Sequence, residues 1–510
     1  QKAFLNPPFS LNTVDIDTKE TTWSFVDVSP DGKTLIFDML GDLYQVPVEG
    51  GKAQALTEGI AWNYQARFSP NGREIAFISD RDGADNIWVM DTDGSKPRQI
   101  SSESWKTYGT HNIHTPYWTP DGQWIAARKG YVSSRSIPAG AIWMYHRTGG
   151  QGNMVVDRLH GDDSQKNIVE PSFSPDGKTM YFSQDITTGT EWLYNKDATG
   201  SVHAIKKMTL DSGKIETYVS GAGGAIRAIP SPDGKSLAFI KRLPNMRSAL
   251  YLKDIKSGNE RAIYANLDRD NQETTGTHGN YPAYAWTPDN KKIVIWSDGH
   301  IQSIDIASGK ASVIPVEINT SRKIRKSLRS EVAVAPEQFD VKMLRWAQYT
   351  PDKQTVIFQA LGHLYRKDLG NNKQVQITQK KDHFEFWPSL SQDGKHLVYV
   401  SWNDQQLGSI NMMPSKGGRS RKITKDPGHY IEPSLSPDNK QIVYRKLSGG
   451  YLLSPLWSAD TGIYLQSVKG GEPKRISDSG SNPQFSADGK HVYFSEMNKG
   501  LLTLVRVDLN

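Results

Sequence analysis

Few residues in this sequence have the types and spacing that catalysis or metal binding requires. His111 and His114 form a His-x-x-His pair. A zinc site would need a third ligand, so a loop pair ahead of a strand is the simpler interpretation, with metal binding as the alternative. No His-x-His, His-Glu-x-x-His or Gly-x-Ser-x-Gly motif occurs, so the common zinc-hydrolase and serine-hydrolase signatures are missing. The acidic stretch Asp80–Asp85 lacks the roughly twelve-residue calcium-loop pattern and indicates a turn. The sequence predicts no catalytic residue, metal ligand or cofactor in this chain.

A second set of residues is polar or aromatic and lies close to prolines that begin regularly spaced strands. Loops that lead into the innermost strands of a ring-shaped fold gather around its axis, where binding sites tend to lie. Charges and aromatic rings there could bind a peptide or a small polar ligand. The alternative is that they hydrogen-bond to backbone groups and channel water. These candidate ligand-binding residues are His114, Glu170, Arg227, Tyr281, Glu385, Trp387, Glu432 and Asn482.

A repeated turn determines which elements must carry these residues. Ser-Pro-Asp-Gly and close variants occur ten times, at intervals of 40 to 63 residues, and such self-similarity is typical of propellers and solenoids. Proline presets φ, aspartate bonds to nearby backbone, and glycine or asparagine accepts a positive φ, so each copy predicts a tight hairpin. The copies begin at Ser29, Ser69, Thr119, Ser174, Ser231, Thr287, Thr350, Ser391, Ser436 and Ser486.

Short apolar runs after each turn predict the strands. A run such as Leu35–Phe37 follows the turn, a third strand such as Asn86–Asp91 comes next, and traces of a fourth remain, as at Gln99–Ser101. No segment has an apolar period of about 3.6 residues, so almost no helix is expected. Four strands per repeat predict an all-β fold of about ten four-stranded antiparallel blades, as in β-propellers.

The blade count and one repeated phrase predict two domains. One propeller usually holds about four to eight blades, and Phe37–Tyr44 is echoed by Phe358–Tyr365 and by no segment between them. We place the boundary near Arg325, with a first propeller, expected to have six blades, in residues 1–325 and a second in residues 326–510. The second shows four blades and no final fourth strand. Because an open ring exposes strand edges, we expect further sequence or a partner to complete it.

Composition narrows the class of protein. The 510 residues carry a formal charge of +6 and no cysteine, which gives a nucleic-acid role no support and excludes disulfides and a cysteine nucleophile. No apolar run reaches the roughly 18 residues of a membrane span, and the start at Gln1 is read as that of a processed, mature chain. The basic run Arg322–Arg329 indicates a solvated linker, with an anionic partner as the alternative.

Several of these phrases resemble TolB-type propeller repeats. Phe77–Arg81 together with Asn86–Gly94 carries that resemblance. TolB itself has a separate α/β domain ahead of its ring, and no segment here resembles that domain, so the resemblance does not imply binding to Pal.

A resemblance over essentially the whole chain is to the N-terminal propeller half of exported amidohydrolases, in which TolB-like blades precede a metal-dependent hydrolase barrel. The phrases that carry it are Val26–Gly51, Tyr281–Asp289, Trp402–Asp404 and Tyr430–Pro433. It implies a periplasmic or secreted protein that admits, filters or docks substrate for a hydrolase of amide or related bonds. The partner would be a hydrolase domain or another protein, with a divalent metal such as zinc only in that hydrolase. The alternatives are a peptide gate like that of tricorn or prolyl-oligopeptidase-type peptidases, and a TolB-like scaffold for protein interactions.

Overall fold

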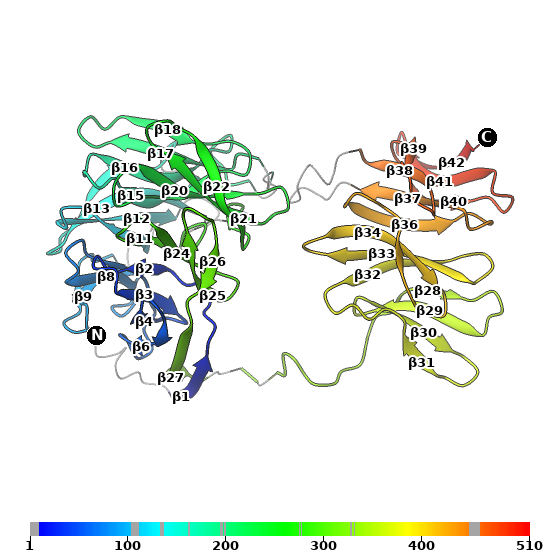
Figure 1. The fold of residues 1–510 in the computed structure, drawn as a ribbon, viewed down its shortest axis with the longest axis horizontal. Helices are drawn as coiled ribbons and strands as arrows, with labels where there is room; N and C mark the ends of the chain where they lie inside the picture. Colours follow the sequence, from blue (N-terminus) through cyan, green and yellow to red (C-terminus); the bar gives the residue numbers. More distant parts are fainter. Residues whose placement is uncertain are drawn as a thin grey trace. The chain divides into compact units, whose positions relative to one another are not determined.

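The computed structural model shows a chain built from β-strands and the turns between them (Figure 1). The structure describes residues 10–103, 112–132, 137–161, 164–193, 197, 200–274, 276, 278–326, 329–330, 332–447 and 460–509. Within these ranges every regular element is a strand, and no helix long and apolar enough to cross a membrane is present. The chain divides into two compact units, Gln1–Ser330 and Glu331–Asn510.

The repeated turn joins the first and second strands of each sheet through one set of side-chain contacts. In the fourth copy, the Ser174 hydroxyl donates to the Asp176 carboxylate at 2.5 Å and accepts the Thr179 backbone N–H at 3.0 Å. Gly177 closes the turn with a φ of +69°. These short-range bonds satisfy the hairpin from within its own sequence, so each copy folds alike.

The first unit contains six four-stranded antiparallel sheets, in each of which the strands lie side by side in chain order. Their strands are β2 (Val26–Val28), β3 (Thr34–Met39), β4 (Asp42–Pro47) and β6 (Gln54–Ala55); β7 (Asn63–Phe68), β8 (Glu74–Ser79), β9 (Asn86–Asp91) and β10 (Arg98–Gln99); β11 (Asn112–Trp118), β12 (Trp124–Val132), β13 (Pro138–His146) and β14 (Asn153–Val156); β15 (Ile168–Phe173), β16 (Thr179–Asp185), β17 (His203–Thr209) and β18 (Ile215–Val219); β19 (Ile226–Pro230), β20 (Ser236–Arg242), β21 (Ser248–Asp254) and β22 (Glu260–Leu267); and β23 (Ala285–Trp286), β24 (Lys292–Ser297), β25 (His300–Asp305) and β26 (Ala311–Val313).

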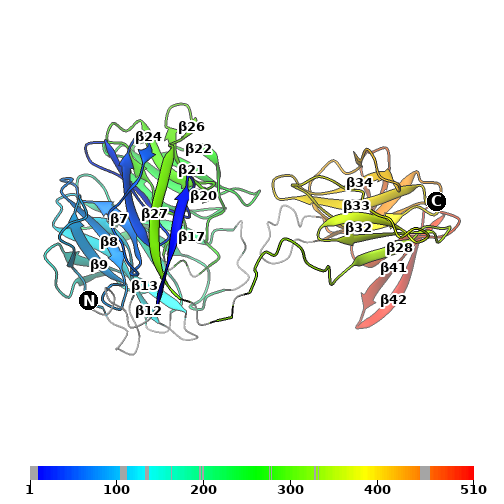
Figure 2. The ribbon, with the colours of Figure 1, turned by 90° about the horizontal axis from the view of Figure 1, so that it is seen from below.

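The sixth sheet packs against the first and closes a ring. The Val26 N–H donates to the Ala283 carbonyl at 2.9 Å, and one apolar cluster contains residues of both sheets, including Phe37 and Trp296. An added sheet reinforces the closure, because β27 (Val316–Arg325) pairs antiparallel with β1 (Leu11–Thr18) and parallel with β5 (Gly51–Lys52). Figure 2 shows β1 and β27 side by side. The predicted boundary near Arg325 falls on the last residue of β27.

The second unit contains three four-stranded sheets and a final three-stranded sheet. Their strands are β28 (Arg345–Tyr349), β29 (Thr355–Ala360), β30 (His363–Asp368) and β31 (Gln374–Gln376); β32 (Phe384–Leu390), β33 (His396–Asn403), β34 (Leu407–Pro414) and β35 (Arg421–Lys422); β36 (His429–Leu435), β37 (Gln441–Leu447), β38 (Gly462–Ser467) and β39 (Lys474–Ser477); and β40 (Ser481–Phe485), β41 (His491–Asn498) and β42 (Leu501–Asp508). Apolar clusters join consecutive sheets. Leu501, Leu502 and Leu504 on β42 are exposed.

The all-β propeller fold predicted from the repeat is confirmed by these sheets. The predicted fourth strand at Gln99–Ser101 ends earlier than expected, since β10 ends at Gln99 and the Ser101 hydroxyl accepts the Ile87 N–H at 2.9 Å in place of a strand bond. The interpretation of Arg322 as part of a solvated linker was wrong. It lies in β27, where strand alternation turns it inward, and its guanidinium is buried against Asp42.

Candidate functional site: the axial channel of the first unit

A β-bulge recurs in the innermost strand of four blades of the first unit. The register with the second strand shifts at the same place in β7, β11, β15 and β19. The residue at each bulge lies four positions before the turn and has a positive φ, which L-residues adopt only where the surroundings hold them. These residues are Gln65 (58°), Thr115 (55°), Glu170 (66°) and Arg227 (54°). Phe25 and Ala283 occupy the same position in the other two blades.

These six residues, one from each blade, surround one small space between the innermost strands, which we call the constriction. All six line a cavity of only about 10 Å³, which is close to the space of a single water molecule. The constriction shares Arg67 and Tyr117 with a cavity of about 240 Å³ lined by prolines of the repeated turns. It shares Phe25 and Gln65 with a larger cavity of about 630 Å³, which we call the chamber. The constriction therefore separates two wider spaces.

A buried ion pair occupies one side of the constriction. Glu170 and Arg227 lie 3.1 Å apart, and both side chains are almost completely buried. The Glu170 carboxylate accepts the N–H groups of Arg227 and Asn280 at 2.8 and 2.6 Å and the Ser183 hydroxyl at 2.5 Å. The Arg227 guanidinium donates to the Tyr281 carbonyl at 2.6 and 3.0 Å. Burial lowers the pKa of Arg227 to about 10, which leaves it charged at neutral pH.

Backbone hydrogen bonds fix the opposite side. The Asp38 carboxylate accepts the Phe25 N–H at 2.9 Å and the Gln65 N–H at 2.6 Å. The Gln65 amide in turn accepts the Thr115 N–H at 2.6 Å and donates to the His278 carbonyl at 2.8 Å. Each side chain links two blades or a blade and a loop, so the constriction is held from several directions.

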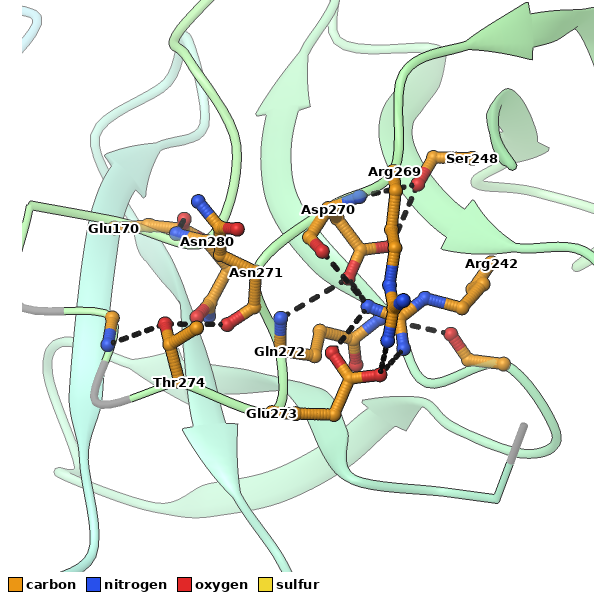
Figure 3. Close-up of polar contacts among 12 residues, drawn as sticks. Glu170, Arg242, Ser248, Arg269, Asp270, Asn271, Gln272, Glu273, Thr274 and Asn280 are labelled. Carbon is orange, nitrogen blue, oxygen red and sulfur yellow. Dashed lines mark hydrogen bonds and ion pairs between the residues drawn. The ribbon is translucent and has the colours of Figure 1, made fainter. Parts of the chain in front are cut away.

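A strap between β22 and β23, residues 268–274, 276 and 278–280, forms one wall of the chamber. Its first half is anchored by Arg242, whose guanidinium contacts Asp270 and Glu273 (Figure 3). The Ser248 hydroxyl donates to Asp270 at 2.7 Å. Its second half reaches Glu170 through the Asn280 N–H. The strap thus connects the chamber with the constriction.

The structure places the predicted residues of the first unit deeper than the sequence indicated. We expected mouth loops ahead of the innermost strands, but His114, Glu170 and Arg227 lie within β11, β15 and β19 and are buried. That expectation was wrong because the innermost strands begin several residues before the prolines that were taken to start them. Tyr281 precedes β23, is also buried, and its hydroxyl donates to the Trp296 carbonyl at 3.2 Å.

His114 is not the surface loop residue that the sequence indicated. It precedes the bulge residue Thr115, its ring packs 4.3 Å from that of His278, and its Nδ1 lies 3.3 Å from the Tyr64 hydroxyl. Burial holds the pKa of His114 well below its usual range. His111 lies outside the described residues. Within the described part of the chain, no three His, Asp or Glu side chains form a group that could hold a metal ion.

The predicted residues of the second unit follow the same local pattern. Trp387, Glu432 and Asn482 have positive φ values of 51°, 53° and 53° at the bulges of β32, β36 and β40. The Glu432 carboxylate accepts the Asn482 N–H at 2.6 Å. Glu385 lies two positions earlier than Trp387, 3.0 Å from His363 Nδ1, and burial raises its pKa.

Sequence reasoning missed three bulge residues and two neighbours of the channel. The fixed offset of four positions before each turn identifies the bulge residues Gln65, Thr115 and Trp346. The ring centroid of Trp346 lies 4.8 Å from that of Trp387. Asp38 and His278 have no such signal, because they reach the channel from a second strand and from the strap.

Comparisons with known proteins agree with the fold. Residues 19–139 match the PD40 family, described as TolB beta propeller domain. An uncharacterized protein of Agrobacterium fabrum is 26% identical over 42% of this chain and 69% of its own length. An uncharacterized peptidase of Bacillus subtilis is 27% identical over 26% of this chain, and a Tol-Pal system protein TolB of Francisella tularensis is 35% identical over 21%. The matched segment spans only 23% of each of these last two proteins.

A solved structure of a putative TolB from Agrobacterium tumefaciens covers 55% of this chain and 94% of its own, with 20% identity and a TM-score of 0.39. The recurrent four-stranded sheets and the family match over residues 19–139 lead to one conclusion. The chain is a TolB-like β-propeller protein.

Proposed function

We propose that this chain is a non-catalytic binding module that admits or docks a peptide or small polar substrate for an exported, metal-dependent amidohydrolase. The observation that carries the proposal is the constriction. A solute that travels along the axis meets a ring of six residues with the buried, hydrogen-bonded Glu170–Arg227 pair on one side. Such a ring admits ligands that can replace its hydrogen bonds and rejects others, because buried polar groups left unpaired are costly.

The hydrolytic chemistry belongs to the partner in this proposal. A divalent metal such as zinc would lie in the hydrolase domain, and the chain would work in the periplasm or outside the cell. A peptide gate for a peptidase is the second candidate, favoured by the sequence match to the Bacillus subtilis peptidase. A scaffold for protein interactions is the third, favoured by the match to the Tol-Pal system protein.

A plug in the channel tests the binding role. Because the chain has no cysteine, Thr22→Cys at the rim of the chamber can be labelled alone with a bulky maleimide. Equilibrium dialysis would then measure retention of a pool of acetylated, amidated Gly-X-Gly peptides in which X is varied over acidic, neutral and basic side chains. We expect the unlabelled protein to retain a subset of the pool and the labelled protein to release it.

Lys256→Cys, on the exposed turn between β21 and β22 and outside the chamber lining, is the matched control. Label there should leave retention unchanged. If no peptide is retained, or if the two labels act alike, the binding role is wrong. Reading the gene beyond the codon for Asn510 tests the hydrolase: a metal-hydrolase barrel with a His-x-His pair supports it, and a stop codon contradicts it.

A further inference from the structure

The chamber combines three carboxylates with aromatic walls. Its volume is about 630 Å³, enough for a side chain or a short peptide end. None of its lining residues is a lysine or an arginine. The lining consists of Thr22, Trp23, Phe25, Asp38, Met39, Leu40, Gly41, Trp62, Tyr64, Gln65, Asp80, Asp85, Asn271, Thr274, Gly276, His278 and Gly279.

Two of the three carboxylates lack the cationic partner that other buried carboxylates of this unit have. Asp27 pairs with Arg67 at 3.1 Å, Asp42 with Arg322 and Glu170 with Arg227. In contrast, Asp38 is 6% exposed, accepts two backbone N–H groups, and has no Lys or Arg within ion-pair distance among the described residues.

Asp85 likewise has no ion pair within the described ranges, and the nearby Tyr64 hydroxyl partly offsets the rise that burial causes in its pKa. Asp80, the third carboxylate, accepts the Trp62 N–H at 2.8 Å and lies in the field of Arg322 and Arg81. A buried carboxylate without a counter-charge is costly unless something supplies one. The chamber therefore holds carboxylates whose ionised form lacks a counter-charge.

The aromatic residues add a second feature that suits a cation. Trp62 is 53% exposed at the chamber, with Trp23 and Tyr64 also in its lining. Gly41 allows Trp62 to close in, since a Cβ there would lie 2.9 Å from the indole ring. The Arg322 guanidinium lies 5.7 Å from the centroid of the same ring, so Trp62 already accepts one cation on its surface. Organic cations bind favourably over the faces of such rings.

A buried nitrogen without a partner adjoins the chamber. His114 Nδ1 lies 3.3 Å from the Tyr64 hydroxyl. His114 Nε2 has no hydrogen-bond partner among the described residues although the side chain is fully buried. His114 contacts two lining residues, Tyr64 and His278. A buried polar atom without a partner is uncommon in folded proteins.

From this geometry, and resting on the proposed function, we infer that the chamber binds an organic cation. The ligand class is the ammonium or guanidinium group of a peptide, supplied by a lysine or arginine side chain or by a free amino terminus. Asp38 and Asp85 provide the counter-charge, and Trp62 covers the alkyl or planar part of the group.

The titration of the chamber fits such a ligand. Burial raises the pKa of Asp38 to about 7, and burial also raises the pKa values of Asp80 and Asp85. Burial and the nearby Arg128 lower the pKa of His278, which is therefore neutral at pH 7 and does not compete with the ligand. A bound cation favours the ionised carboxylates, so binding should strengthen as pH rises from about 6 to 8.

Isothermal titration of the full chain with four peptides tests the inference. The probes are Ac-Gly-Arg-Gly-NH2, Ac-Gly-Lys-Gly-NH2, their neutral citrulline isostere Ac-Gly-Cit-Gly-NH2, and Gly-Gly-Gly-NH2 with a free amino terminus. We expect at least one cationic probe to bind about tenfold more tightly than the citrulline peptide, as one desolvated charge contact provides. The arginine, lysine and free-terminus probes distinguish the source of the cation.

Two variants locate the site without disturbing the constriction. Trp62→Ala, at an exposed side chain, and Asp85→Asn should each weaken binding of the cationic probe about fivefold or more and leave the citrulline peptide unaffected. Asp31→Asn, in a repeated turn, removes one exposed carboxylate outside the chamber lining and is the matched control.

The outcomes separate this inference from the proposed function. Equal affinities for the citrulline and cationic peptides, with binding still blocked by label at Thr22→Cys, would reject the cation site and keep the binding module. If the Trp62→Ala and Asp85→Asn variants both still bind the cationic probe more tightly than the citrulline peptide, the site lies elsewhere and the inference is rejected. Absence of binding by every probe and by the Gly-X-Gly pool would reject both.

Discussion

The two units are built from the same repeat but differ in how deeply they bury the residues at its bulge. In both, a bulge with a positive φ turns a polar or aromatic residue toward the centre of the blades. In the first unit Glu170 and Arg227 are 2% and 4% exposed, whereas in the second Glu432 is partly buried and Asn482 is exposed. Six sheets and the β1–β27 pair close the first unit. Local geometry is thus a property of the repeat, and burial is a property of the closed ring.

The phrase shared by the two units sharpens this contrast. Leu43 and Leu364 both donate their N–H to a threonine hydroxyl at 2.9 Å, Thr57 and Thr378 respectively, so the local bonds are the same. The residue that follows phenylalanine differs, since Asp38 in the first unit corresponds to Gln359 in the second. The phrase thus carries a carboxylate, Asp38, in the first unit, and this residue lines the chamber.

The largest expected effect comes from the closing strand. Ile318 on β27 is 1% exposed and Leu504 on β42 is 71% exposed. Ile318→Asp should lower the free energy of unfolding of the first unit by about 4 kcal/mol, because it buries an unpaired carboxylate. Leu504→Asp should change that of the second by less than about 0.5 kcal/mol. Urea unfolding followed by peptide-resolved hydrogen exchange measures each unit separately, and equal losses would refute the role of closure.

Removal of the axial carboxylate compares the two units directly. Glu170→Gln leaves the buried Arg227 without a counter-charge, so we expect a loss of about 3 kcal/mol in the first unit. Glu432→Gln affects a wider 3.8 Å contact with the partly exposed Arg445, so a loss below about 1 kcal/mol is expected. Urea unfolding of the two variants tests this order. A larger loss for Glu432→Gln would contradict it.

A pH series on Asp38→Gln, which introduces the residue of the second unit, isolates the buried carboxylate. The pKa of Asp38 is about 7 when folded and ordinarily 3.8. The native state therefore holds a proton that the unfolded chain releases, and stability falls as pH rises through this window. Between about pH 5 and 7 the wild-type free energy of unfolding should fall by about 2 kcal/mol more than that of the variant. Parallel curves would show that Asp38 does not titrate there.

The smallest effect concerns the turns. Lys353 in the second unit has a φ of +55°, where the fourth copy has Gly177 at +69° with open space on the side where a Cβ would point. Lys353→Gly should stabilise the second unit by about 0.5–1 kcal/mol, and Gly177→Lys should destabilise the first by a similar amount. Thermal unfolding of the exchange pair provides the measurement. A destabilised Lys353→Gly would mean that its side chain makes contacts that outweigh the strain.

Much of the fold could be predicted from the sequence, and less of the site. The predicted third strand Asn86–Asp91 has the same bounds as β9, because its apolar run and the turn ahead of it act within a few residues. Glu170 and Arg227 were named as candidates, but their depth was missed. The register of a bulge depends on the neighbouring strand, which a single sequence pattern does not contain.

By itself, the sequence determined the hairpins and the four-strand blades, since both depend on bonds between residues close together in the chain. Only the tertiary structure decided which charges are paired. Arg322 meets Asp42 across 280 positions, and Asn280 meets Glu170 across 110. Asp38 received no cation among the described residues, although Asp27 received Arg67. These outcomes follow from closure of the ring, because contacts between distant segments depend on how whole sheets pack and not on the local pattern.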